Sequence, residues 1–318
     1  MASNKSALTT NKLIESVKRR ALVPSSNITF SDNDLIEFLN EELNIGLIPS
    51  ILQMKDEYLV FKEIIPIQNG NTTYPIPARA IGNKLREISY SDDGRNEYNM
   101  TQIELDNKVS NNYLNQGGFY ASQFYVQGSS IHLHPNDFSY SGYLFFYYYM
   151  RPNYLVKDNS VAVIKDIDRT TGTLTFNSLP STYTSGVDCD FINSDSPNNI
   201  MSIDIPLISV NQVTKTVVVD PTLIPSNLKK GDYMPIAGES CVPNVPTELH
   251  AILAQRVAMR VLEAIGDSQG LTNAKMKLDE MEAKTGVLVD SRVEGSPIKV
   301  KNRQMQYTLR GRFMRGTF

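Results

Sequence analysis

The sequence of 318 residues contains no tryptophan, only two cysteines and only three histidines. Two thiols, Cys189 and Cys241, are too few for a disulfide framework, so a reducing cytoplasm is the expected place of synthesis. The first twenty residues lack the apolar stretch of a signal peptide. The longest apolar run, Tyr143–Met150, is far shorter than the ~20 residues that span a bilayer. We therefore expect neither a secreted, disulfide-rich domain nor a transmembrane protein.

Sequence motifs of the common enzyme classes are also missing. The chain has no Gly-x-Ser-x-Gly nucleophile motif, no Gly-x-x-x-x-Gly-Lys phosphate-binding loop and no dinucleotide-binding fingerprint after a strand. With three histidines and two cysteines, the supply of catalytic side chains is small. We therefore predict that the protein is not an enzyme and binds no cofactor.

The three histidines are the first candidates for a metal site. His132 and His134 alternate on a predicted strand and so share a face, where they could bind Zn²⁺ or Cu²⁺. No third ligand is close in sequence, so the alternative is that both are solvent-facing strand residues. His250 lies off the apolar stripe of its predicted helix and is expected at the surface or in an interface. We predict that the chain has no metal site.

Two pairs of carboxylates, Asp166 with Asp168 and Asp188 with Asp190, have the spacing of a strand. Such pairs could hold Ca²⁺ or serve as acid and base in glycoside hydrolysis. An apolar residue separates the two members of each pair. This pattern favours an outward acidic face on a strand whose other face is buried.

Apolar periodicity divides the chain into helical ends and a β-rich middle. Helical spacing covers residues 1–59 and 246–286, whereas a spacing of two and frequent turn residues cover 60–245. Residues 287–318 have no periodicity long enough for an independent element. We predict an α+β fold in which the helices of both ends form one bundle. A large antiparallel β region is inserted between them, and an extended tail leaves the body.

The boundaries of the predicted helices carry clear signals. Ser31 is a good N-cap with Asp34 three residues later, and Phe30 and Leu35 have the spacing of a hydrophobic staple. Pro49 either begins a separate helix that runs to about residue 58 or kinks a continuous one. The helices after residue 246 are expected to break at 266–270 and to end at Gly286 as a C-cap.

Turn residues predict how the β region is connected. Asn69-Gly70-Asn71 between two apolar segments is a strong signal for a hairpin that joins 65–67 to 74–76. The run 169–172 is a second tight reversal. Strands are expected at Lys84–Tyr90, Phe119–Val126, Ile131–Leu133, Tyr143–Met150, Val161–Ile167, Thr173–Phe176, Cys189–Ile192, Leu207–Val210, Val213–Val219 and Asp232–Ile236.

The aromatic residues are mostly tyrosine, with 16 Tyr and 12 Phe. Tyrosine has an apolar ring and a polar tip, so it suits surfaces that alternate between water and a partner. Tyrosine also favours strands without any such role. Both readings stay open on the sequence alone.

Charge is distributed unevenly although the net charge is only −3. Residues 60–245 carry 13 Lys and Arg against 18 Asp and Glu, whereas 246–318 carry 12 against 8. The chain as a whole is therefore no electrostatic trap for nucleic acid. The last twenty residues contain six cations and no acid.

The basic tail is the segment for which we predict a partner. Pure phosphate-binding tails need no apolar anchors, whereas Arg mixed with aromatic residues and Met is typical of protein interfaces. The tail could add a strand to the sheet of a neighbour, with alternate side chains in pockets. A disordered basic tail and contact with DNA are the alternatives. The predicted interface residues are Lys299, Lys301, Arg303, Tyr307, Leu309, Arg310, Arg312, Phe313, Arg315 and Phe318.

Nine segments between residue 10 and about residue 285 follow one another in a recognisable order: 13–24, 29–42, 48–49, 56–58, 74–82, 124–128, 144–152, 231–233 and 246–250. This order resembles that of the neck proteins of tailed bacteriophages. Among those proteins, the chain resembles the head-to-tail adaptor (connector ring) proteins of podovirus-type and crAss-like phages. The similarity is one of pattern and order rather than of a diagnostic motif.

The resemblance implies a structural role in the virion. Such adaptors form a closed ring, usually twelve-fold, below the portal protein, extend the DNA channel and offer a platform to the next neck or tail ring. DNA passes through without sequence-specific contact, and a C-terminal segment commonly docks on the portal. Here that segment would be 287–318. The protein would be made in the cytoplasm of the host bacterium and reside at the head–tail junction.

Two other classes of function compete with this one. A tail-tube, fibre or baseplate subunit is possible on composition, although the chain lacks the repeats expected of a fibre. A carbohydrate-binding or glycan-hydrolysing β module would require the aspartate pairs to converge with aromatic side chains in one cleft. The β region of about 180 residues is a departure from the small adaptors.

Overall fold

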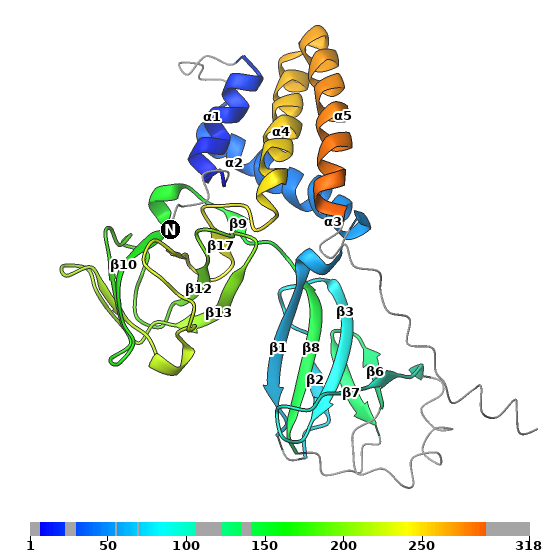
Figure 1. The fold of residues 1–318 in the computed structure, drawn as a ribbon, viewed down its shortest axis with the longest axis vertical. Helices are drawn as coiled ribbons and strands as arrows, with labels where there is room; N and C mark the ends of the chain where they lie inside the picture. The colour runs from blue at the N-terminus through cyan, green and yellow to red at the C-terminus, as the bar shows by residue number, and fades with distance from the viewer. Residues whose placement is uncertain are drawn as a thin grey trace, which may run out of the picture.

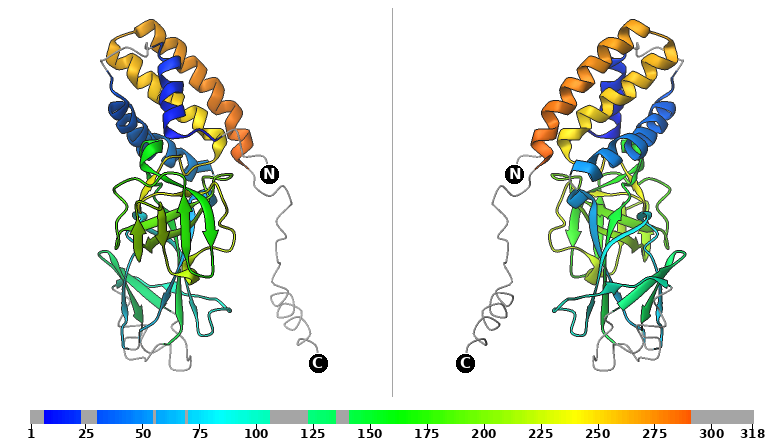
Figure 2. Two further views of the ribbon diagram at one scale, coloured as in Figure 1. Left: turned by 90° about the vertical axis from the view of Figure 1, so that its left-hand side faces the viewer. Right: turned by 90° about the vertical axis from the view of Figure 1, so that its right-hand side faces the viewer.

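The computed structural model describes residues 7–22, 30–54, 56–68, 70–105, 123–134 and 141–290, with the side chains of 286–290 excepted. It has three parts: a helical bundle at one end and two β units (Figures 1 and 2). The predicted α+β class is confirmed, with helices from both ends of the chain around a large antiparallel β region.

Five α-helices from the two ends of the chain share one apolar core. They are α1 (Thr10–Arg20), α2 (Asp32–Glu41), α3 (Ile48–Met54), α4 (His250–Ile265) and α5 (Ser268–Asp290). The core contains Leu13 and Val17 of α1, Leu39 of α2, and Leu253 and Val257 of α4, none of them exposed. Because each helix has one apolar face, segments about 200 residues apart in sequence bury those faces together.

The predicted cap of α2 is confirmed in detail. The Ser31 hydroxyl accepts a hydrogen bond from the Asp34 amide, and the Asp34 carboxylate accepts one from the Ser31 amide, which completes a capping box. Phe30 packs near Phe38, with 6.2 Å between ring centroids. Phe30 also packs against the apolar cluster that contains Leu35, and the direct contact between these two residues stays a prediction.

Pro49 lies in a continuous helical run. A π-helical segment, Glu42–Leu47, joins α2 directly to α3, and Pro49 is the second residue of α3. The Ile48 amide donates to the Leu43 carbonyl, a bond that spans five residues. The π turn therefore ends immediately before the residue that has no amide hydrogen to donate. A 3₁₀ turn, Asp56–Leu59, then leads into the first strand.

The first β unit consists of two stacked four-stranded sheets. One has the order β1-β8-β3-β4 and the other β2-β7-β6-β5. Buried side chains of both sheets, including Phe146, Tyr148, Ile131 and Leu133, fill the space between them. The strands are β1 (Val60–Pro66), β2 (Thr73–Pro75), β3 (Ala80–Ser91), β4 (Tyr98–Asn99), β5 (Thr101–Gln102), β6 (Gln123–Gln127), β7 (Ser130–His134) and β8 (Tyr143–Met150).

The predicted hairpin between 65–67 and 74–76 is wrong. The turn exists, because the Asn71 amide donates to the Gln68 carbonyl at 2.9 Å and Gly70 has a φ of 82°. The strands on either side enter different sheets, however: β1 pairs with β8, and β2 pairs with β7. The aromatic strand β8 offers β1 a seven-residue register, which a hairpin with the three-residue β2 could not match.

The second β unit is a seven-stranded antiparallel sheet with the order β13-β12-β16-β10-β11-β15-β14. The predicted reversal at 169–172 is the turn between β10 and β11. The sequence did not suggest β13. The strands are β10 (Ala162–Asp168), β11 (Thr173–Phe176), β12 (Asp188–Ile192), β13 (Ile200–Pro206), β14 (Ser209–Asn211), β15 (Thr216–Val218) and β16 (Tyr233–Met234).

Two short parallel strands, β9 (Tyr154–Leu155) and β17 (Glu239–Ser240), lie where this unit meets the bundle (Figure 1). The buried Asn40 of α2 donates to the Leu155 carbonyl at 3.1 Å and accepts from the Leu155 amide at 2.7 Å. One side chain thus satisfies a free strand edge and connects the bundle to the second β unit.

The two C-terminal helices form an antiparallel hairpin that projects from the body (Figure 1). A 3₁₀ turn at Thr247–Leu249 precedes α4. The residue after α4, Gly266, has a φ of 82° and forms a left-handed C-cap. The break is shorter than predicted, because α5 already starts at Ser268. The predicted end at Gly286 is wrong, since α5 continues to Asp290; a glycine costs a helix interior only about 1 kcal/mol.

Candidate assembly surfaces

The predicted interface residues of the tail all lie outside the described residues. These are Lys299, Lys301, Arg303, Tyr307, Leu309, Arg310, Arg312, Phe313, Arg315 and Phe318. What the structure does describe is the helix that leads to them. α5 packs against the bundle through Leu271, Ala274, Leu278 and Met281. Its other side is solvent-exposed, and Met276 there is 61 % exposed.

Ion pairs hold the C-terminal hairpin to the N-terminal helices. Arg256 of α4 donates to Glu282 of α5 at 2.6 Å and to Glu42 of the π-helical segment at 3.2 Å. Arg260 donates to Glu41 at 2.5 Å. Arg256 thus joins α4, α5 and the π-helical segment. Its side chain is only 17 % exposed, so these contacts lie close to the core. Charges from both ends of the chain thereby fix where α5 points.

A groove of about 230 Å³ lies between α3 and the C-terminal hairpin. Its lining includes the apolar side chains of Leu47, Met54, Leu249 and Ile252 together with both members of the Arg256–Glu282 pair. Thr285 also lines it, so the groove is next to the last described turn of α5. A groove in this position would be available to a segment arriving at the base of the bundle.

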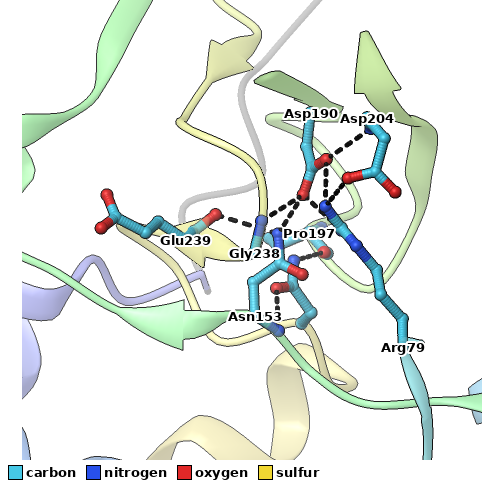
Figure 3. Close-up of polar contacts among 8 residues, drawn as sticks. Arg79, Asn153, Asp190, Pro197, Asp204, Gly238 and Glu239 are labelled. Carbon is cyan, nitrogen blue, oxygen red and sulfur yellow. Dashed lines mark hydrogen bonds and ion pairs between the residues drawn. The ribbon is translucent and has the colours of Figure 1, made fainter. Parts of the chain in front are cut away.

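A buried carboxylate, Asp190, lies at the junction of the two β units (Figure 3). Arg79, which precedes β3 in the first unit, donates to both Asp190 oxygens at 2.7 and 2.9 Å and to Asp204 at 2.6 Å. Asn153 donates to Asp190 at 2.6 Å. The backbone amides of Asp204 and Gly238 add two further bonds, each of 3.1 Å.

At this junction, burial and ion pairing act in opposite directions on the pKa of Arg79. Burial alone would lower the pKa of Arg79, but the hydrogen bonds and negative charges of Asp190 and Asp204 outweigh it and raise that pKa. Asp190 accepts five hydrogen bonds in all, so its buried charge is fully compensated. The junction is therefore a fixed structural contact between the units.

The expectation that both aspartate pairs form an outward acidic face is correct for three of the four residues. Asp166 is exposed and pairs with Lys230 at 2.9 Å, and Asp168 accepts bonds within the following turn. Asp188 is exposed, but Asp190 is buried. The pairing of β12 with β13 shifts register between Cys189 and Phe191, and this irregularity turns Asp190 toward Arg79.

The histidines also differ from expectation. His250 is fully buried: its Nδ1 accepts from the Leu8 amide at 3.1 Å, and its Nε2 lies 3.2 Å from the Val245 carbonyl. Burial lowers the pKa of His250 to about 4. His134 is buried as well, whereas His132 is half-buried, stacks on Tyr125 and contacts Thr73. Both His134 and His250 are buried, so the surface positions predicted for them are wrong.

Several tyrosines use their hydroxyl groups within the chain. On the outer face of β8, Tyr147 donates to Glu97 at 2.8 Å and Tyr149 to Asp56 at 2.6 Å. The Lys62 ammonium lies 4.2 Å from the centre of the Phe145 ring. In the second unit Tyr183 donates to the Met234 carbonyl at 2.5 Å. Tyr147, Tyr149 and Tyr183 are therefore structural residues whose hydroxyl groups are already bonded within the chain.

No cluster of three or more potential metal-ligating side chains occurs among the residues that the structure describes. Within those same ranges, no helix has the length and apolar character needed to cross a bilayer. No family model matches the chain, and no curated protein matches it significantly.

Proposed function

We propose that this protein is a structural subunit of a tailed phage, a head-to-tail adaptor that forms a closed ring below the portal protein. In this role it extends the DNA channel, offers a platform to the next neck or tail ring, and touches DNA without reading its sequence. It is not an enzyme. Its place is the head–tail junction of the virion.

The observation that carries the proposal is the construction of the bundle from both ends of the chain. The order of segments that resembles phage adaptors corresponds to α1 and α2, then the β region, then α4. A ring subunit needs two different surfaces that fit each other head to tail. The bundle has a long helix, α5, that is packed on one side only and leads into a cationic tail.

The charges of the chain fit the same role. Residues 60–245 are net acidic, so they would repel DNA wherever they face a channel. The tail after α5 is cationic and carries aromatic and Met side chains, a composition suited to a protein acceptor such as the portal. The acidic region 60–245 and the cationic tail would thus have different partners.

The test is the position and copy number of the protein in purified virions. We expect quantitative mass spectrometry to give a small fixed copy number, and asymmetric cryo-electron microscopy of the unique vertex to place it as a ring against the portal. Absence from that vertex, or presence only at the distal tail, would contradict the proposal and favour a fibre or baseplate subunit.

Removal of the tail gives a second test. A chain that ends at Asp290 keeps every described helix and strand, so we expect it to fold but to be absent from assembled particles. If the six cations of 299–318 carry the docking, binding of the full chain to the portal should also weaken as salt is raised. Normal incorporation of the truncated chain would remove the docking role.

A further inference from the structure

Among the described residues, strands cover only part of one flank of the first β unit. Of the twelve residues of β3, only Ser89 and Tyr90 pair with β4. In the second sheet β5 pairs only with Gln123 and Phe124 of β6. Between β4 and β5, the Met100 amide also donates to the Ile88 carbonyl at 2.9 Å. In the described ranges no further strand adjoins the outer edge of β3 before Ile88 or of β6 beyond Phe124. This flank faces away from the second β unit (Figure 1).

A groove of about 250 Å³ runs between these two edges. Its apolar lining comes from both sheets: Leu85 and Ile88 of β3, and Phe124 and Val126 of β6. Leu85 and Val126 are half-buried, so part of the apolar lining still contacts solvent. Open strand edges beside apolar pockets are the features that bind an extended peptide as an added strand.

The tail contains one segment with the matching pattern. From Gln304 to Arg310 the sequence alternates, with Met305, Tyr307 and Leu309 at odd positions and Gln304, Gln306 and Thr308 at even ones. In a strand, alternate side chains share a face, so the three large residues would lie on one side. No glycine or proline occurs between Lys299 and Arg310, and Gly311 follows directly.

The length of the chain is compatible with this acceptor. Fourteen residues separate Asp290 from Met305, which in extended form reach up to ~50 Å. The exposed Arg86 and Glu87 both line the groove, so the acceptor is selected by its apolar lining and open edge rather than by charge. The edge β1 on the other side of the first sheet is a poorer acceptor, because Lys62 and Pro66 lie on it.

We propose that this flank binds residues 304–310 of the chain's own tail as an added strand, with Met305, Tyr307 and Leu309 in the groove. Backbone hydrogen bonds to the open edges supply the general affinity, and the three side chains set the register. The last eight residues, from Gly311, are left for another partner. This inference does not depend on the proposed adaptor ring, because the tail segment and the groove that accepts it belong to the same protein.

Hydrogen–deuterium exchange of the purified full-length protein tests the proposal. We expect the amides of 304–310 to exchange at least tenfold more slowly than their intrinsic rate. A triple substitution of Met305, Tyr307 and Leu309 by Ser should remove that protection and also expose the amides of β3 before Ser89. The matched control replaces Gln304, Gln306 and Thr308 by Ser and should retain protection within twofold.

Two further variants separate strand addition from loose apolar docking. Gln306→Pro removes a backbone donor from the tail without touching the folded body, and it should abolish protection at the flank. A Leu85→Ser and Val126→Ser double variant should do the same, whereas Ile64→Ser on the opposite edge should not. Exchange of the 304–310 amides at the intrinsic rate overturns the proposal. Protection of these amides that survives in the Leu85→Ser and Val126→Ser double variant overturns it too. Tail-dependent protection found around Met54 of α3, instead of at β3, would also overturn it.

Discussion

The helical bundle and the junction of the two β units connect distant parts of the chain by opposite means. The bundle joins its two ends through an apolar core, with ion pairs such as Arg260–Glu41 at its outside. The junction joins the β units through a buried charge, Asp190, that accepts five hydrogen bonds. Apolar contacts are many and individually replaceable, whereas a buried charge depends on every one of its partners.

The largest effect should come from breaking the junction. Arg79→Met leaves Asp190 buried without its cation, so we expect the free energy of unfolding to fall by about 3–5 kcal/mol. The matched change in the bundle, Arg260→Met, removes an exposed pair and should cost at most about 1 kcal/mol. Urea unfolding measures both.

A further substitution separates the charge from the packing. Adding Asp190→Asn to Arg79→Met removes the uncompensated charge and should recover part of the lost stability. If the two arginine variants are equally stable, or the double variant is no better than Arg79→Met, then the junction is held by packing in the same way as the bundle.

A similar division separates the features that the sequence could predict from those that it could not. The faces of α2 and α4, the cap at Ser31 and the reversal at 169–172 depend on neighbouring residues, and all were predictable. The partner of β1, the burial of Asp190 and the position of His250 depend on contacts with residues between 77 and 242 positions away. The sequence offered one small indication of the junction: Arg79 is a lone charge in the otherwise apolar and proline-rich run 74–81. Pairing between distant strands leaves no local sequence pattern, so the other long-range contacts could not be predicted.

At His250 the bundle resembles the junction, because this position buries a titratable group. With its pKa lowered to about 4 in the folded chain and near 6.5 when unfolded, His250 takes up a proton on unfolding between these values. Stability is therefore unaffected by this group above pH 6.5 and falls as pH drops toward 4, by roughly 2–3 kcal/mol.

The variant His250→Gln isolates that contribution. An amide can accept from the Leu8 amide and donate to the Val245 carbonyl but does not titrate. We expect its unfolding free energy to change less than that of the wild type between pH 6.5 and 4.5. Parallel pH profiles for the two proteins would show that His250 does not stay neutral in the folded chain.

The smallest effect concerns the outside of the bundle. Ser31→Ala removes the side-chain acceptor of the capping box and should cost about 1 kcal/mol. Thr9 precedes α1 in the same position, but its side chain makes no capping bond, so Thr9→Ala should leave the thermal midpoint nearly unchanged. A loss of stability that is equal in the two variants would mean that the capping box of α2 contributes nothing.

The assembly of the bundle from both ends of the chain also determines the order of events on the ribosome. α1 to α3 are synthesised first, yet the residues of α4 that cover their apolar faces follow almost 200 residues later. At the usual ~5–20 residues per second, that interval is on the order of 10–40 s. Both β units can fold within it. Until translation reaches α4, Leu13, Leu39 and their neighbours remain without their native cover and are open to chaperones.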